Sequence, residues 1–430
     1  SSRRRHTRSA YVTGVLTCAL PICEKAARLR ITRGKAALLA LCFLGFVLYG
    51  MYYNGFGANA EAAMAYFGID EAQNGAILTV QSFGCLAVAV LLGLFGERLN
   101  KMYALAFGIL LLGLAGVCIG LIPGLVPTAA GYAAMLGFSL VAGVGFICID
   151  LLTNSLIADV FREDKTRVLP YAHAFYGGGA MLAPVFVTAI VSPALPESFA
   201  RPYLIIGLGA VLTGAVLALC ARRIAPETPY ADMAAIRRRA KSNPAEIFRE
   251  GRAWLFLLSA FMNLAFQTGL TTWLPRYCSA TRGYDFTQAG LTVTLYFLGA
   301  LAIRLLSPVA YAKIGVRRFY CGSLLSSTAL YLVFMLLPMP DWADSVSICL
   351  LGFLLGATVP SLIIICCDAF PERTASASSI VVFGVSLASM TAPLLVGRMM
   401  TFDPHIAMLS ITACPVIAAL ALPRQKKPPV

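Results

Sequence analysis

Asp150 is the one acidic residue inside the long apolar stretches of this chain, within residues 131–158. A carboxylate among apolar groups is costly unless it binds a partner or faces a cavity. Burial also favours its protonated form, so such a group can take up and release a proton in a working cycle. A proton-coupling role is therefore one reading of Asp150. A neutral Asp, hydrogen-bonded between packed helices, would leave the same pattern.

The neighbours of Asp150 at helical spacing favour a cavity wall. Ile147 and Asn154 lie three and four residues from Asp150, so the three share one helical face, which also carries Gly143. His173 is the second titratable candidate, because imidazole changes charge near neutral pH and can relay a proton. A lone histidine in an apolar segment can equally donate one hydrogen bond to a neighbouring helix. We predict that Asp150 and His173 handle protons.

Neutral polar side chains form the second group that could do chemistry. Asn263 and Gln267 lie one helical turn apart, and an amide both donates to and accepts from a hydroxyl. Trp273 could cover the apolar face of a sugar ring, or it could lie in the aromatic belt at a membrane interface. The aromatic residues near 52 could contact substrate or only pack. The predicted substrate contacts are Asn154, Gln267, Asn263, Trp273, Tyr52, Tyr53 and Asn54.

Twelve apolar stretches, in two sets of six, must position these side chains. A stretch of about 20 apolar residues crosses ~30 Å of hydrocarbon as a helix. The composition, with 59% hydrophobic residues, 13% charged residues and a mean hydropathy of +0.79, excludes a single soluble core. We therefore predict an all-α membrane protein. The expected spans are 37–58, 75–95, 103–123, 131–158, 170–192, 203–221, 254–275, 288–311, 319–338, 346–367, 377–397 and 405–422.

The distribution of positive charge predicts the topology. Most of the 34 Lys and Arg residues precede the first span, follow the last span or fill the even-numbered connections. The odd-numbered connections hold only Arg201, Arg276, Arg282 and Arg398. Because positive loops stay in the cytoplasm, both termini and the central connection are expected inside a plasma or inner membrane. The net charge of +14 is thus a topology signal that needs no nucleic-acid partner, and the lipid bilayer is the expected partner.

The expected divisions are a first bundle at 23–221, a cytoplasmic linker at 222–252 and a second bundle at 253–430. Residues 1–22 lack an initiator Met and resemble the translated read-through of a sequencing adapter; a signal peptide is the alternative. Many of the thirteen cysteines lie inside spans, so a disulfide framework is not expected. No spacing predicts a metal site or a cofactor, and no His, Asp, Glu or Cys constellation predicts an enzyme.

The two sets of six show traces of an internal duplication. The run Asp159-Val160-Phe161-Arg162-Glu163 closes the fourth span, and Asp368-Ala369-Phe370-Pro371-Glu372 closes the tenth. At the same offset Gly143 corresponds to Gly352, and at a similar offset Gly84 corresponds to Gly299. These matches, in the same order and in corresponding helices, predict a parallel six-plus-six repeat.

After the second span the chain resembles the major facilitator superfamily. The sequence there is Gly93-Leu94-Phe95-Gly96-Glu97-Arg98-Leu99-Asn100-Lys101. This is similar to the loop motif of the family, with Glu97 where Asp is usual and Asn100 where Gly is usual. The resemblance implies a charge latch between the bundles, with an ordinary solvated turn as the alternative. Arg304 could pair with Asp368 in one transport state or extend to the inner face. The predicted latch residues are Gly93, Glu97, Arg98, Lys101, Asp159, Arg304 and Asp368.

A narrower resemblance is to the fucose, galactose and glucose proton symporters. It rests on Asp150 and Asn154 after Gly143-Val144-Gly145, on His173-Ala174-Phe175-Tyr176-Gly177-Gly178-Gly179-Ala180, and on Trp273-Leu274-Pro275-Arg276-Tyr277. The subfamily tends to have a Glu where this chain has Gln267, and some members have a carboxylate in the first span, where this chain has none. Asp150 is thus the strongest proton candidate.

The resemblance implies a monomeric transporter that works by alternating access. The expected activity is uptake of a monosaccharide or similar small polar metabolite, driven by the proton gradient without any cofactor. A proton-coupled exporter of small amphipathic compounds is the alternative. Against an exporter, the fifth span lacks a clear copy of the Gly-Pro pattern of antiporters, since Pro184 follows Ala183.

Overall fold

A computed structural model describes residues 32–69, 71–192, 194–232, 234, 246–284, 286–400 and 402–424. Within these ranges the chain is built from helices, and the β-type pairing described is one isolated bridge between Ser192 and Leu195. The expected leader, residues 1–22, lies outside the described residues. The all-α prediction is confirmed.

The first bundle contains six long helices and several short ones. The long helices are α1 (Arg33–Asn54), α3 (Glu71–Phe95), α4 (Lys101–Gly120), α6 (Thr128–Val160), α7 (Lys165–Ile190) and α8 (Ala200–Ile224). The short elements are α2 (Phe56–Phe67), η1 (Gly96–Arg98), α5 (Ile122–Leu125) and η2 (Pro196–Phe199). The chain then leaves the bundle through η3 (Ala225–Glu227), η4 (Pro229–Ala231) and α10 (Glu246–Arg249).

The second bundle repeats this plan, with two of its spans broken. Its helices are α11 (Gly251–Arg282), α12 (Phe286–Ile314), α13 (Val316–Leu336), α14 (Asp341–Leu355), α15 (Thr358–Ala369), α16 (Thr374–Met400), α17 (Pro404–Leu409) and α18 (Ala413–Leu420). In the described part of the chain, eleven helical segments are long and apolar enough to cross a membrane, and α17 with α18 form a shorter twelfth. This is the predicted twelve-helix arrangement.

The break between α14 and α15 has a local cause. Pro360 has no N–H, so it cannot donate to the carbonyl four residues earlier, that of Gly356. The Nε of Arg304 donates to this freed carbonyl over 2.9 Å. A side chain of α12 thus replaces the missing backbone hydrogen bond of the tenth span.

Corresponding glycines form the same helix crossing in each bundle. Gly84 of α3 and Gly143 of α6 each lie against the backbone of the other helix, at the carbonyls of Leu140 and Gln81. Gly299 of α12 and Gly352 of α14 do the same, at the carbonyls of Cys349 and Tyr296. A Cβ at any of these positions would collide with a carbonyl oxygen. The repeat traced in the sequence is therefore also a repeat of packing.

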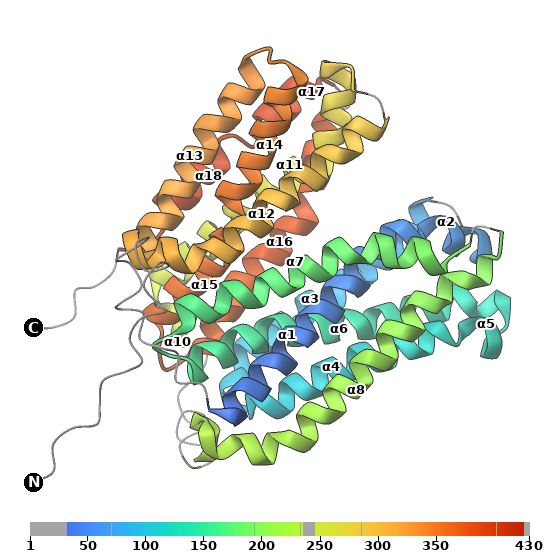
Figure 1. Cartoon of the computed structure of the whole chain (residues 1–430), viewed down its shortest axis with the longest axis vertical. Helices are drawn as coiled ribbons and strands as arrows, with labels where there is room; N and C mark the ends of the chain where they lie inside the picture. The colour runs from blue at the N-terminus through green and yellow to red at the C-terminus, as the bar shows by residue number, and fades with distance from the viewer. Residues whose placement is uncertain are drawn as a thin grey trace, which may run out of the picture.

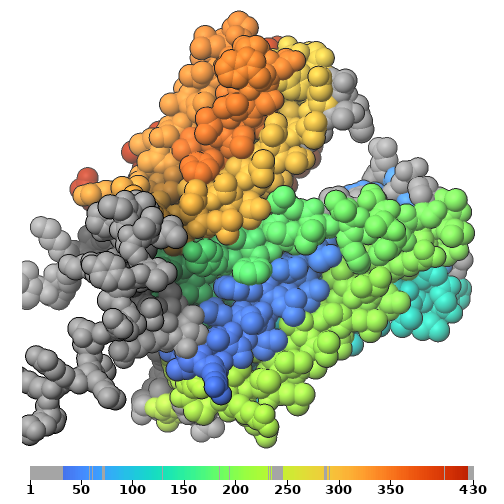
Figure 2. All heavy atoms as spheres, viewed as in Figure 1, coloured from blue at the N-terminus to red at the C-terminus, as the bar shows by residue number. Residues whose placement is uncertain are grey.

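The two bundles meet at one end and diverge at the other (Figure 1). They meet where α1 begins and where η3, η4 and α10 connect them, and we call this the linker end. Helices α3, α6 and α7 of the first bundle contact α12, α15 and α16 of the second. The space-filling view shows a V-shaped opening between the bundles at the opposite, open end (Figure 2).

Candidate functional site

Asp150 lies on the wall of a cavity between the two bundles. The cavity has a volume of about 140 Å³ and is lined by α1, α3 and α6 of the first bundle and α16 of the second. At 1.5 Å per residue, Asp150 lies ~15 Å from the linker end of α6. The lining side chains are Tyr49, Tyr53, Ser82, Cys85, Leu86, Ile147, Asp150, Val382, Val385, Ser386, Ser389 and Met390.

A chain of hydrogen bonds leads from Asp150 into the first bundle. The Nδ2 of Asn154 donates to Oδ1 of Asp150 over 3.0 Å, and Oδ1 of Asn154 lies 3.2 Å from Nε2 of His173. Since the Asn154 oxygen can only accept, His173 must carry a proton on Nε2. Asn154 and His173 are buried, and the ring of Phe46 lies 5.5 Å from the imidazole. The structure thus brings together three predicted residues, with every donor directed toward Asp150.

The two predicted amides of the second bundle also lie together. The Nε2 of Gln267 donates to Oδ1 of Asn263 over 2.9 Å and to Oγ1 of Thr358 over 3.2 Å. The hydroxyl of Tyr296 donates to Oε1 of Gln267 over 3.1 Å. Thr358 and Tyr296 were not predicted, because neither residue belongs to a recognisable motif. Together the four side chains form a cluster of neutral hydrogen-bonding groups on α11, α12 and α15.

Trp273, for which a sugar-stacking role and an interfacial role were both considered, contacts α16. Its indole Nε1 donates to the carbonyl of Pro393 over 2.8 Å, and its ring lies against Gly397. Both partners belong to α16, so Trp273 packs α11 against α16. Its small partner Gly397 makes room for the large ring.

The three candidates near the end of α1 point in different directions. Tyr52 is 4% exposed, and its ring lies between those of Phe146 and Tyr203, so it packs inside the first bundle. This placement corrects the prediction that Tyr52 contacts substrate. Tyr52 differs from Tyr53 because consecutive residues on a helix point about 100° apart. Tyr53 lines the cavity instead. Asn54 donates to the hydroxyl of Tyr176 over 3.3 Å and to the carbonyl of Gly50 over 2.9 Å.

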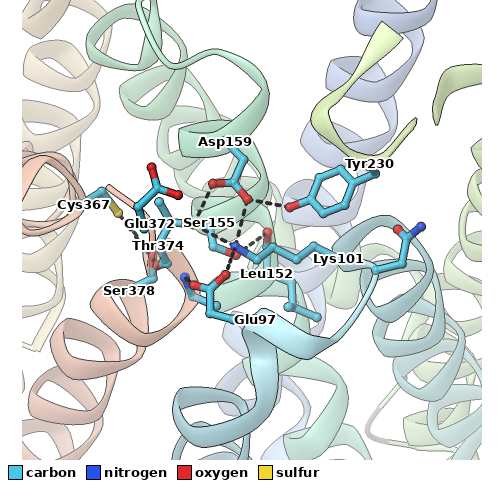
Figure 3. A network of polar contacts seen from close by, with 12 residues as sticks. Glu97, Lys101, Leu152, Ser155, Asp159, Tyr230, Cys367, Glu372, Thr374 and Ser378 are labelled. Atoms are coloured by element: carbon cyan, nitrogen blue, oxygen red, sulfur yellow. Dashed lines mark hydrogen bonds and ion pairs between the residues drawn. The ribbon is translucent and has the colours of Figure 1, made fainter. Parts of the chain in front are cut away.

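Lys101 is the centre of a buried ionic cluster at the linker end (Figure 3). Its side chain is 2% exposed, and its Nζ lies 2.9 Å from Oδ2 of Asp159 and 3.2 Å from Oε2 of Glu97. The same Nζ donates to Oγ1 of Thr374 over 2.7 Å, and Thr374 in turn donates to Oδ1 of Asp159 over 2.8 Å. Tyr230 donates to Oδ2 of Asp159 over 2.6 Å. One cation thus joins two carboxylates of the first bundle to α16 of the second.

Glu97 and Gly93 complete the contact with the N-terminus of α16. The Oε1 of Glu97 accepts from the backbone N–H of Ala375 over 2.6 Å, where negative charge also interacts favourably with the helix dipole. Ser376 donates to the carbonyl of Gly93 over 2.8 Å, and Ser379 touches Gly93. The structure therefore unites four predicted latch residues, Gly93, Glu97, Lys101 and Asp159. Their partners lie in the run of small and hydroxyl residues from 374 to 379, which was not predicted.

The other three predicted latch residues lie outside this cluster, although one of them makes a second contact between the bundles. Arg98 is exposed and lies over the ring of Phe95, with 5.5 Å from Cζ to the ring centroid. Asp368 pairs with Lys165, which joins α15 to α7. Arg304 does not pair with Asp368 here, because it lies ~15 Å from the linker end of α12 and bonds to backbone carbonyls.

Tyr230 shows that the connection between the bundles takes part in the closed contact. Because a phenylalanine keeps the ring but removes the donor, Tyr230→Phe should cost about 1–3 kcal/mol at a charged acceptor. We expect the linker end to open more often and the rate of uptake to change by several-fold, with little loss of expression. Uptake by reconstituted protein, together with labelling of a cysteine placed at the linker end, measures both effects. Unchanged labelling of Tyr230→Phe would show that the hydroxyl does not hold the contact.

No group of three or more His, Cys, Asp or Glu side chains among the described residues could hold a metal ion. The polar features described above are a carboxylate on a cavity between two bundles, a neutral cluster in the second bundle, and an ionic contact that closes one end. This arrangement suits a binding site with alternating access better than a catalytic centre.

Comparison with known proteins agrees with this geometry. One stretch of 150 residues, 35% of this chain, is 28% identical to "Bypass of stop codon protein 6" of Saccharomyces cerevisiae and spans 29% of that protein. Among solved structures, the transporter FucP in its outward conformation is 16% identical, with a TM-score of 0.76, over 91% of this chain and 99% of that one. A second structure of FucP is described as that of the E. coli fucose:proton symporter.

Two further structures share the fold. The proton:xylose symporter XylE is 15% identical, with a TM-score of 0.70, over 90% of this chain and 94% of that one. A bacterial homologue of ferroportin in its outward-facing state is 14% identical, with a TM-score of 0.73, over 90% and 98%. At these identities the likeness establishes the fold alone. The family model described as Major Facilitator Superfamily matches residues 41–393 and again 279–429, so the chain belongs to that superfamily, as a multi-pass membrane transporter.

Proposed function

We propose that this transporter is a proton-coupled symporter that takes up a monosaccharide or a similar small polar metabolite. The observation that carries the proposal is Asp150 on the wall of a cavity formed by both bundles. Two of the proteins that share its fold are described as proton symporters, one for fucose and one for xylose. The neutral cluster around Gln267 adds groups that hydrogen-bond hydroxyls in both directions.

The positive charge of the connections supports a cytoplasmic linker end in a plasma or inner membrane. With that orientation the structure represents the outward-open state, since the linker end is closed and the opposite end is open. FucP in its outward conformation has the highest TM-score quoted above, which supports this assignment.

The proposed cycle begins with Asp150 taking a proton from the outer side. Protonation removes a negative charge from the cavity wall and therefore lowers the cost of enclosing that wall between the bundles. Substrate then binds, the open end closes, and the latch around Lys101 separates. Proton and substrate leave on the inner side, and the unloaded protein returns. Asn154 and His173 hold the orientation of the carboxylate throughout.

Reconstituted protein in liposomes tests the proposal. An inward proton gradient should drive labelled substrate, screened from a panel of monosaccharides and sugar derivatives, to ~10-fold accumulation per pH unit for one proton per substrate. A protonophore should return the level to equilibrium, and liposomes without protein serve as the control. Accumulation that survives the protonophore, or outward pumping of amphipathic compounds with no inward accumulation, would contradict the proposal.

A further inference from the structure

Arg304 carries a positive charge where α7 of the first bundle crosses α12 of the second. Its Nε donates to the carbonyl of Gly356 over 2.9 Å, and its Nη1 lies 3.4 Å from the carbonyl of His173. A guanidinium has five N–H donors and stays charged at any physiological pH. Two donors are therefore fixed on backbone groups, and the other three are directed elsewhere from a partly buried side chain.

Among the described residues, no carboxylate forms an ion pair with Arg304. Of the two acids on helices near it, Asp368 pairs with Lys165, and Asp150 accepts from the neutral Asn154 and forms no ion pair with Arg304. A charge at this depth in a membrane protein is costly and normally pairs with an opposite charge or faces an aqueous cavity. The site therefore offers a place for an anion.

The surroundings of Arg304 suit a hydroxylated anion. Tyr176 precedes Gly177, which borders Nη1 of Arg304, and Tyr296 lies on the same helix as Arg304, so each bundle contributes one tyrosine to this region. Tyr176 accepts from Asn54, and Tyr296 donates to Gln267 in the neutral cluster. Gly177 leaves the space beside Nη1 free of any side chain of its own. A charged group and two phenol groups thus belong to the facing helices α7 and α12, with Arg304 at a depth in the membrane close to that of Asp150.

We propose, building on the transport function proposed above, that the substrate is a sugar acid or a similar polyhydroxylated carboxylate. Its carboxylate binds the free edge of the Arg304 guanidinium, which the Nε contact with Gly356 holds in place, and its hydroxyls meet Tyr176, Tyr296 and Gln267. Planar bidentate pairing with a carboxylate is the interaction for which Arg is best suited. A neutral sugar would leave the charge of Arg304 unbalanced inside the closed protein.

This substrate class changes the electrical character of transport. One proton on Asp150 and one monoanion on Arg304 move no net charge, whereas one proton with a neutral sugar moves one positive charge. A potassium diffusion potential, negative inside, should therefore leave the uptake of a sugar acid unchanged when no pH gradient is present. The same potential would drive the uptake of a neutral sugar.

The experiment compares D-glucuronate and D-gluconate with D-glucose and D-galactose on the purified full chain. We expect the acids, at a concentration of ~10 mM that exceeds a millimolar Kd, to raise the thermal unfolding midpoint. The neutral sugars at the same concentration should leave it unchanged. In Arg304→Gln the apparent affinity for the acids should fall at least ~10-fold, and Arg304→Lys should retain part of it. The exposed Arg318→Gln serves as the matched control and should behave as wild type.

Two results would overturn the inference. One is binding of a neutral sugar with no effect of either acid on the wild-type protein, a comparison that requires no variant to fold. The other is equal stabilisation of wild type and Arg304→Gln by the acids. Proton-driven uptake of a neutral sugar would leave the proposed function standing while removing its restriction to anions. Failure of the proposed function would instead appear as the loss of proton-driven accumulation for every compound.

Discussion

Asp150→Asn should abolish proton-driven accumulation while preserving exchange of substrate across the membrane. The amide has the size and hydrogen-bonding shape of a protonated carboxyl group, so Asn154 can still contact position 150. However, an amide cannot release a proton, so the variant permanently resembles the carrier with a proton on residue 150. Net uptake against a gradient should fall to the equilibrium level, and counterflow of labelled substrate should continue. Both are measured with the same liposomes, by imposing either a pH gradient or an excess of unlabelled substrate inside.

The matched control for Asp150→Asn is Asp341→Asn, an exposed acid at the start of α14. It should accumulate substrate as wild type does. His173→Asn tests whether His173, the second predicted proton-handling residue, carries a proton or only orients Asn154. If it only orients Asn154, the variant should transport more slowly but should still couple uptake to the proton gradient. Accumulation by Asp150→Asn at the wild-type level would show that the coupling proton binds elsewhere.

Lys101→Met should open the linker end and cause the largest loss of stability in the first bundle. Methionine keeps the length of the side chain but removes the cation that lies between Glu97 and Asp159. Removing one partner of a buried ion pair typically costs about 3–5 kcal/mol, because the remaining charges lose their compensation. The two acids then repel each other at the contact with α16. We expect uptake to fall by at least ~10-fold and the thermal unfolding midpoint in detergent to drop.

Cys367 reports directly on this opening. It is 1% exposed, and its Sγ lies 3.5 Å from Oγ of Ser378, beneath the latch. A membrane-permeant maleimide should label Cys367 faster in Lys101→Met than in wild type, as measured by mass spectrometry of the labelled peptide. Neutralising the acids in Lys101→Met/Asp159→Asn/Glu97→Gln should restore much of the protection. Lys313→Met, which removes an exposed lysine at the end of α12, is the matched control and should be labelled as wild type is. Equal labelling in Lys101→Met and wild type would contradict a latch centred on Lys101.

The spans and the grouping of Asp150 with Asn154 could be predicted because both depend on local spacing. Hydrophobic length defines a span, and helical periodicity defines a shared face. Glu97 and Lys101 of the latch could be predicted because they belong to the family's loop motif after the second span. By contrast, Tyr230 docks on Asp159 from 71 positions away, and no pattern around Tyr230 signals this contact. Contacts of this kind arise only when the elements are placed in space.

The direction of the α1 side chains could not be read for a different reason. A helix that is apolar on every side shows no contrast between its lipid face and its packed face, so Tyr52 and Tyr53 look equivalent in the sequence. The partner of Trp273 could not be predicted for a similar reason, because it is a backbone carbonyl on α16. Backbone partners leave no trace in the pattern of residue types.

The glycine crossings have a mechanical consequence for the carrier. Where backbone meets backbone at Gly84 with Gly143, and at Gly299 with Gly352, no flexible side chain separates the helices. These crossings cannot adjust by changes of side-chain rotamer. We therefore expect α3 to move together with α6, and α12 together with α14. The displacement that exchanges the open and closed ends must then be concentrated where the bundles face each other, at α3 with α16 and at α7 with α12. The duplicated glycines thereby stiffen each bundle, and the motion between the bundles takes place at the helix contacts that join them.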